Sequence, residues 1–386
     1  MFFLDNASTT QCFTESAEII KQALINDYFN PSAKYRYAME EQKKLNECRR
    51  IILSSVGAIN FDCIFTGSAT ESNNLVINSL VTKHYVSLIS GGEHSSIYEP
   101  VQKELEDSRK IEFLKLDEFG AVDLKDFEDK MTKDVGFISV MYVSNETGAI
   151  NDIKQIVEIA RSVNPKVLIH VDAVQGYCKL PINLEEWGID YLTISSHKVN
   201  GPKGVGALIV RKKCKLSPQI LGGGQENGVR SGTENLPSVL GFANSVKIHM
   251  STIDEDYKKV LEFKTNFYNR LLSLSKDSGV EMELNGKMCG FSPYILSVSF
   301  VGIKAEVLLH SLEEKDILVG TGSACNSHHS GNRVLEGMHK TKAEVEGNIR
   351  FSFSSESVNY DAQYLAQTII ENAKKIKIPR KGVEPL

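Results

Sequence analysis

Two short apolar runs near the middle of the chain, each followed by ionisable residues, constrain the fold more than any other feature. Residues 167–171 run directly into Asp172, and residues 191–195 run into a Ser-His-Lys triplet that ends at Lys198. Runs of this length suit buried strands, and strands that alternate with helical patterns predict a mostly parallel, doubly wound α/β sheet. Loops diverge at the carboxyl ends of such strands and leave a crevice, so we expect Asp172 and Lys198 to face one pocket.

The alternation of strand and helix patterns extends through most of the chain. The predicted strands of this region cover residues 61–65, 85–89, 137–142, 167–171 and 191–195. The predicted helices cover residues 14–25, 37–56 and 152–163 and a segment that carries Ile97, Val101 and Leu105. The last third has the pattern of a small α+β unit, with strands at 295–300, 317–319 and 349–353, a helix at 305–312 and a closing helix that ends near 376.

A chain of 386 residues is too long for one ordinary hydrophobic core, so we expect two domains. A glycine-rich loop at 221–233 is followed by long amphipathic helices, the second of which covers residues 257–274. We place the boundary near the start of that helix. The predicted large domain is 13–255, and the predicted small domain combines 1–12 with 256–386.

Composition excludes several classes of function. The formal net charge of -5 leaves no basic stripe for direct contact with nucleic acid. The N-terminus has no basic region followed by a long apolar core, and no later stretch is apolar enough to span a membrane. The seven cysteines are scattered without a CxxC pair, which indicates reduced thiols in a cytoplasm and no metal site built from cysteines.

A lysine in an apolar pocket can lose its proton and form a Schiff base, and pyridoxal phosphate (PLP) sites pair such a lysine with an acidic partner for the pyridine nitrogen. Lys198 and Asp172 have these two properties, although a solvated lysine and a helix-capping aspartate would look the same in isolation. Residues 66–74, Thr-Gly-Ser-Ala-Thr-Glu-Ser-Asn-Asn, follow a predicted strand. Small and hydroxyl residues at such a junction favour a phosphate site, with a plain N-cap at Ser68 or Thr70 as the alternative.

One cysteine has an unusual setting. Residues 320–331, GTGSACNSHHSG, surround Cys325 with small and polar residues, whereas structural cysteines prefer apolar strands or helices. This predicts an accessible thiol on a mobile loop. Together with a PLP pocket elsewhere in the chain, it favours a reactive cysteine.

Ten motifs in order carry a resemblance that covers nearly the whole chain. The chain resembles the cysteine desulfurases, class V aminotransferase-type members of the fold-type-I PLP-dependent enzymes. The motifs are LDNASTT, NPS, TGSATESNN, GGEHSSI, SNETGAI, HVDAVQ, SSHKVNGPKGVGAL, GGGQENGVRSGTEN, GSACNS and IRFSFS. The resemblance implies a PLP site in the large domain and a catalytic cysteine loop in the small domain.

The resemblance also implies a role for individual residues. The catalytic residues are Lys198, which binds the cofactor, His94, which stacks on its ring and assists proton transfer, and Cys325, which forms a persulfide. Asp172 is the partner of the ring nitrogen and Gln175 of the ring hydroxyl. The remaining cofactor contacts are Ala69, Thr70, Ser195, His197, Asn145 and, on the phosphate of a neighbouring subunit, Thr233. The substrate carboxylate is held by Arg350 and Asn145, and an arginine suits a planar bidentate partner.

The implied reaction converts L-cysteine to L-alanine and transfers sulfur to Cys325 for delivery to an acceptor protein in iron–sulfur cluster assembly, tRNA thiolation or related sulfur modification. The implied assembly is a cytoplasmic homodimer. A selenocysteine lyase or another β-eliminating PLP enzyme would need the pocket but not Cys325. A scaffold for sulfur acceptors would have no use for Lys198, Asp172 and Arg350. The sequence departs from the family pattern at 33–35, at 352–356 and at the pair His328-His329.

Overall fold

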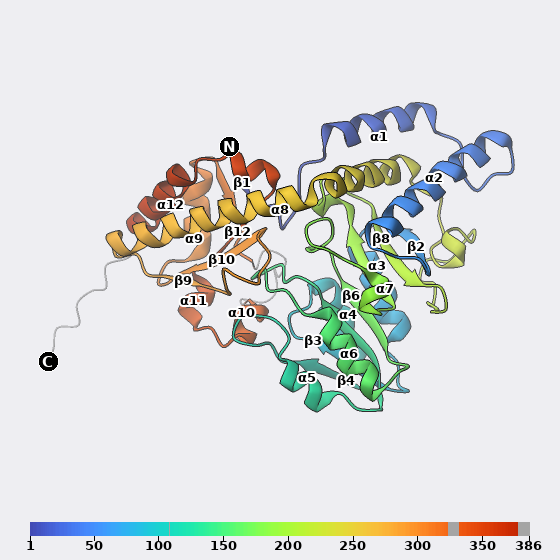
Figure 1. Ribbon diagram of the computed structural model, residues 1–386, viewed down its shortest axis with the longest axis horizontal. Coiled ribbons are helices and arrows are strands. Elements are labelled where there is room, and N and C mark those ends of the chain that lie inside the picture. Colours follow the sequence, from blue (N-terminus) through green and yellow to red (C-terminus); the bar gives the residue numbers. More distant parts are fainter. Residues whose placement is uncertain (108, 323–331, 377–386) are drawn as a thin grey trace.

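A seven-stranded sheet forms the centre of the larger part of the protein (Figure 1). The computed structural model describes residues 1–107, 109–322 and 332–376. The strand order is β2-β8-β7-β6-β5-β3-β4, and β8 is antiparallel to both of its neighbours while the other pairs are parallel. The strands are β2 (Phe61–Thr66), β3 (Val86–Ser90), β4 (Ile111–Leu114), β5 (Val135–Met141), β6 (Leu168–Asp172), β7 (Tyr191–Ser195) and β8 (Gly206–Arg211). The predicted mostly parallel α/β sheet is confirmed.

Helices cover both faces of this sheet, because its central strands are apolar on both sides. Leu45 of α2 and Ile156 of α6 belong to one core, and Val76 of α3 and Val101 of α4 belong to another. The helices of this part are α1 (Thr14–Asn26), α2 (Arg36–Ser55), α3 (Ala69–Leu80), α4 (Ser95–Glu106), α5 (Leu124–Lys130), α6 (Ile153–Val163), α7 (Leu184–Trp187) and the short 3-10 helices η1 (Ser196–Lys198) and η2 (Glu226–Gly228). Two packed faces are the defining property of a doubly wound sheet.

A second, smaller core lies beside the first (Figure 1). Its strands form two small sheets, β12-β10-β9 and β1-β11. The bounds are β1 (Phe2–Leu4), β9 (Met282–Leu284), β10 (Ile295–Phe300), β11 (Ile317–Val319), β12 (Asn348–Ser352), α9 (Ala305–Glu313), α10 (Arg333–Gly337), α11 (Lys342–Glu346), η3 (Ser355–Asn359) and α12 (Ala362–Ile376). Leu4 is fully buried in this core, so the start of the chain packs with its last third.

One helix, α8 (Leu236–Ser278), runs through both parts, and the prediction of separate helices here was wrong (Figure 1). Phe242 packs in the large core near one end, and Phe267 packs in the small core near the other. The polar middle, residues 249–256, spans the gap between the cores, where a helix has no apolar face to bury. The division into 13–255 and 1–12 with 256–386 stays a prediction, and Ala7 packs with the large core. No helix among the described residues is long and apolar enough to cross a bilayer.

Candidate active site

Asp172 and Lys198 line one cavity of about 330 Å³ at the carboxyl ends of β6 and β7. Asp172 is the last residue of β6 and is 3% exposed. Lys198 ends η1, directly after β7, and its Nζ donates to the carbonyl oxygens of Ala7 and Ser8 at 2.6 and 2.5 Å. The N-terminal segment therefore closes this side of the cavity and holds the lysine amine in place.

A chain of hydrogen bonds connects Asp172 to His94. Asn73 of α3 is fully buried, and its Nδ2 donates to Asp172 Oδ2 and to Ser96 Oγ, both at 2.8 Å. His94 caps the N-terminus of α4, and its Nδ1 accepts the backbone N–H of Ser96 at 3.1 Å. The proton of a neutral imidazole therefore sits on Nε2. Burial lowers the pKa of His94 and favours the neutral ring, whereas the charge of Asp172 acts in the opposite direction.

The N-terminus of α3 provides a cradle for an anion. Ala69 and Thr70 lie in its first turn, where backbone N–H groups have no partner within the helix, and both line the cavity. Ser195 lines the same region, and its buried Oγ has no hydrogen-bond partner in the described chain. A Cβ at Gly206 would lie 2.9 Å from the Ala69 nitrogen, so only glycine lets β8 approach so closely. His197 is also here, and burial lowers its pKa to about 4.

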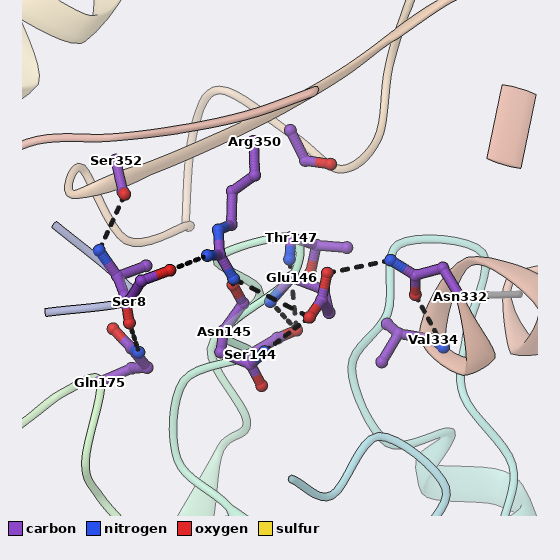
Figure 2. A network of polar contacts seen from close by, with 12 residues as sticks. Ser8, Ser144, Asn145, Glu146, Thr147, Gln175, Asn332, Val334, Arg350 and Ser352 are labelled. Carbon is purple, nitrogen blue, oxygen red and sulfur yellow. Dashed lines mark hydrogen bonds and ion pairs between the residues drawn. The ribbon is translucent and has the colours of Figure 1, made fainter. Parts of the chain in front are cut away.

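Arg350 and Asn145 meet on the other side of the cavity (Figure 2). Arg350 lies on β12 of the small core, and its guanidinium donates to Asn145 O, Ser8 Oγ and Asp5 Oδ1 at 2.9, 2.9 and 3.1 Å. Glu146 Oε1 lies 3.9 Å from Arg350 Nη1. The guanidinium of Arg350 is thus held between the two parts of the protein, with Asp5 beside its Nη2 and Glu146 beside its Nη1.

Three further residues of the predicted set have different placements. Gln175 lines the cavity; its Nε2 donates to Ala7 O at 2.9 Å, while its buried Oε1 has no partner among the described residues. Thr233 is exposed and does not line this cavity, and its contact with a neighbouring subunit stays a prediction. Cys325, like the pair His328-His329, lies outside the described residues.

Several cavity residues were missed by the sequence analysis. Glu93 directly precedes His94, and Glu146 directly follows Asn145. Their positions beside predicted site residues were the sequence signal that could have identified them. Burial raises the pKa of Glu93 well above its usual range, and the charge of Asp172 raises it further. Asn73, which donates a hydrogen bond to Asp172 but does not line the cavity, was quoted only as part of a motif. Arg333 gave no signal at all, because nothing in its own segment connects it to the other cavity residues.

The cavity fits PLP. It offers an amine at Lys198 and a buried carboxylate at Asp172, and the N-terminus of α3 suits a phosphate. The partnerless Ser195 Oγ and Gln175 Oε1 are the kind of buried polar atoms that a bound group would satisfy. A doubly wound sheet with this site defines the fold-type-I PLP-dependent enzymes.

Comparison with known proteins gives the family. Residues 2–365 match the family described as "Aminotransferase class-V", and the chain belongs to this family. The "Cysteine desulfurase IscS" of Dictyoglomus turgidum is 33% identical over 383 residues, covering 97% of this chain and 95% of that protein. Among solved structures, a NifS-like protein from Rickettsia africae is similar with TM-score 0.85 and 27% identity over 97% of this chain and 99% of that one. A structure described as "SspA in complex with cysteine" has TM-score 0.77 and 26% identity, over 92% and 99%.

Proposed function

We propose roles for the cavity residues in the reaction of this chain, which is a PLP-dependent cysteine desulfurase acting on L-cysteine. The observation that carries the proposal is that Lys198, Asp172 and Arg350 line one cavity. Lys198 and Asp172 belong to the part of the protein around the large core, whereas Arg350 belongs to the part around the small core. An amine, an acid and a carboxylate-binding cation suit the reaction of an α-amino acid on PLP.

Lys198 and Asp172 would hold the cofactor, with Ala69, Thr70, Ser195 and His197 around its phosphate. When bound, PLP supplies a sink for the electron pair released at the substrate Cα. Asp172 is kept oriented for the ring nitrogen by Asn73 Nδ2 at 2.8 Å and by the Val174 N–H at 3.0 Å. Lys198 Nζ is the base that takes the Cα proton.

Arg350 and Asn145 would orient L-cysteine by its carboxylate. Asp5 and Glu146 keep the guanidinium in place before the substrate arrives, so little side-chain freedom is lost on binding. His94, with its proton on Nε2, would stack on the ring and move a proton between the substrate and the cavity.

Cys325, in its thiolate form, would attack the substrate sulfur. An S–S bond forms to Cys325 Sγ as the substrate C–S bond breaks. The electron pair of that bond stays with the carbon, which takes up a proton and leaves as alanine. An acceptor protein then removes the sulfur, and iron–sulfur cluster assembly, tRNA thiolation and related sulfur modification are the candidate pathways in a cytoplasmic setting.

The test of the proposed function is a product balance. The purified holoenzyme with L-cysteine and a thiol reductant is expected to release alanine and sulfide in a 1:1 ratio, because one C–S bond breaks for each alanine formed. Both products are measured over the same time course. Pyruvate in place of alanine would contradict the proposal, since it indicates β-elimination.

A homodimer is the proposed assembly, with Thr233 near the phosphate of the partner subunit. Thr233 is exposed, and its neighbour Glu234 accepts a hydrogen bond from Ser32 at 3.1 Å. The adjoining segment exposes Tyr28 and Tyr37 by 72% and 49%. Exposed aromatic side chains of this kind are enriched at protein interfaces.

Light scattering after gel filtration is expected to give twice the chain mass of 42.9 kDa. Thr233→Ala should keep that mass and weaken PLP binding about tenfold, the effect of one hydrogen bond to a charged group. A mass of one chain for the wild-type holoenzyme would contradict the shared site.

A further inference from the structure

Arg333 places a second guanidinium on the wall of the cavity. It is the first residue of α10 and is half-buried. Its guanidinium carbon lies 3.6 Å from the centre of the Tyr98 ring, and its Nη2 donates to the backbone oxygen of Glu93 at 2.5 Å. Stacking on an aromatic face fixes the plane of a guanidinium and leaves its edge for other partners.

No carboxylate of the described residues lies within ion-pair distance of Arg333, whereas Arg350 has Asp5 and Glu146. The Nε–H of Arg333 is buried without an acceptor in the same part of the chain. Glu93 is the adjacent carboxyl group, but its burial raises its pKa well above the usual range, which favours the neutral form. Glu99 and Glu146 act on Arg333 only from beyond ion-pair distance. A partly desolvated cation without a carboxylate in direct contact is costly unless an anion binds beside it.

Other residues than this arginine also hold α10 in place. Asn332 caps α10 by accepting the N–H groups of Val334 and Leu335 at 3.1 and 3.2 Å. Val334 and Leu335 are 4% and 0% exposed and anchor the helix in an apolar cluster. The short helix is therefore held at both its start and its buried face without Arg333.

Glu146 lies between Arg350 and the segment that carries Arg333. One of its oxygens lies 3.9 Å from Arg350, and the other accepts a hydrogen bond from Asn332, the residue before Arg333, at 2.9 Å (Figure 2). Both guanidinium groups act on its carboxyl group, and they lower its pKa against the larger effect of burial. An amino acid held by Arg350 thus lies in a cavity whose wall carries a second cation.

We propose that Arg333 recognises negative charge on the side chain of the bound amino acid, so that the cavity also accepts L-amino acids with a second acid group, of the aspartate type. This rests on the proposed function only in that Arg350 holds the α-carboxylate. Arg333 is a specificity residue for ligands, and it takes no part in breaking the C–S bond.

The test compares L-aspartate with L-asparagine, which has the same size but no side-chain charge. Calorimetric titration of the wild-type holoenzyme is expected to show at least about tenfold tighter binding of L-aspartate, the effect of a charge-assisted hydrogen bond. Arg333→Met should abolish this preference and leave L-asparagine binding unchanged, and Arg333→Lys should retain part of it because the charge remains.

Equal binding of both ligands by the wild type would overturn the inference, and this comparison needs no variant to fold. A similar loss of both ligands in Arg333→Met, with a lowered melting temperature, would also overturn it in favour of a structural role. Neither ligand contains sulfur, so failure here is distinguishable from failure of the proposed function, which the alanine and sulfide balance reports.

Discussion

Replacement of Lys198 by alanine is expected to abolish both the visible absorption of the covalently bound cofactor and the release of sulfide. The rate from L-cysteine should fall at least about a thousandfold, because general base catalysis alone contributes about 10² to 10⁴-fold and the covalent anchor is lost as well. Absorption spectra of the purified variant with added PLP and a single-turnover assay measure the two effects.

Lys179 is the matched control for this substitution. It is a second buried lysine close to Lys198, and burial together with the charge of Lys198 lowers its pKa to about 7, so its amine would be the readier base by acidity alone. It does not line the cavity. Lys179→Met should therefore keep the cofactor absorption. If Lys179→Met loses the absorption while Lys198→Ala retains it, Lys179 and not Lys198 is the lysine that binds the cofactor.

Cys325→Ser is expected to lower sulfide release from L-cysteine at least about a thousandfold, as removal of a nucleophile does in other enzymes. The cofactor absorption should remain unchanged, because Lys198 and Asp172 are untouched. Sulfide and alanine assays under excess reductant measure the loss.

Cys289→Ser provides the control, since Cys289 is the exposed cysteine of the described residues. It should retain full activity. If Cys325→Ser keeps the normal rate with L-cysteine, the persulfide step is wrong, and a selenocysteine lyase or another β-eliminating enzyme becomes the better description. If it loses L-cysteine turnover but acts on L-selenocysteine, both activities share the pocket and only the first needs the thiol.

Strands buried on both faces were the most predictable elements of the fold. Residues 191–195, 295–300 and 317–319 are strands with the predicted bounds, because a short, mainly apolar run flanked by polar or turn residues has few alternatives. The half-buried β4 and the seven-residue α5 gave no such signal and were not predicted. The single helix α8 was missed because its polar middle resembles a loop unless the distance between two cores is known.

The cavity was predictable only where position along a strand fixes position in space. Asp172 and Lys198 follow adjacent parallel strands, so their meeting follows from the strand pattern. Glu146 and Arg333 reach the cavity from two separate segments, and Asn73 reaches Asp172 from a third, so these contacts depend on how the segments pack.

By itself, the sequence determined the class of fold, the lysine and aspartate at the strand ends, and the family resemblance, because hydrophobic periodicity and local motifs are properties of neighbouring residues. Only the tertiary structure decided the partners of Arg350 and Lys198, the lowered pKa of His94 and the raised pKa of Glu93. It also decided that no carboxylate of the described residues lies within ion-pair distance of Arg333. Those properties arise from burial and from distances between segments far apart in sequence, which no local pattern encodes.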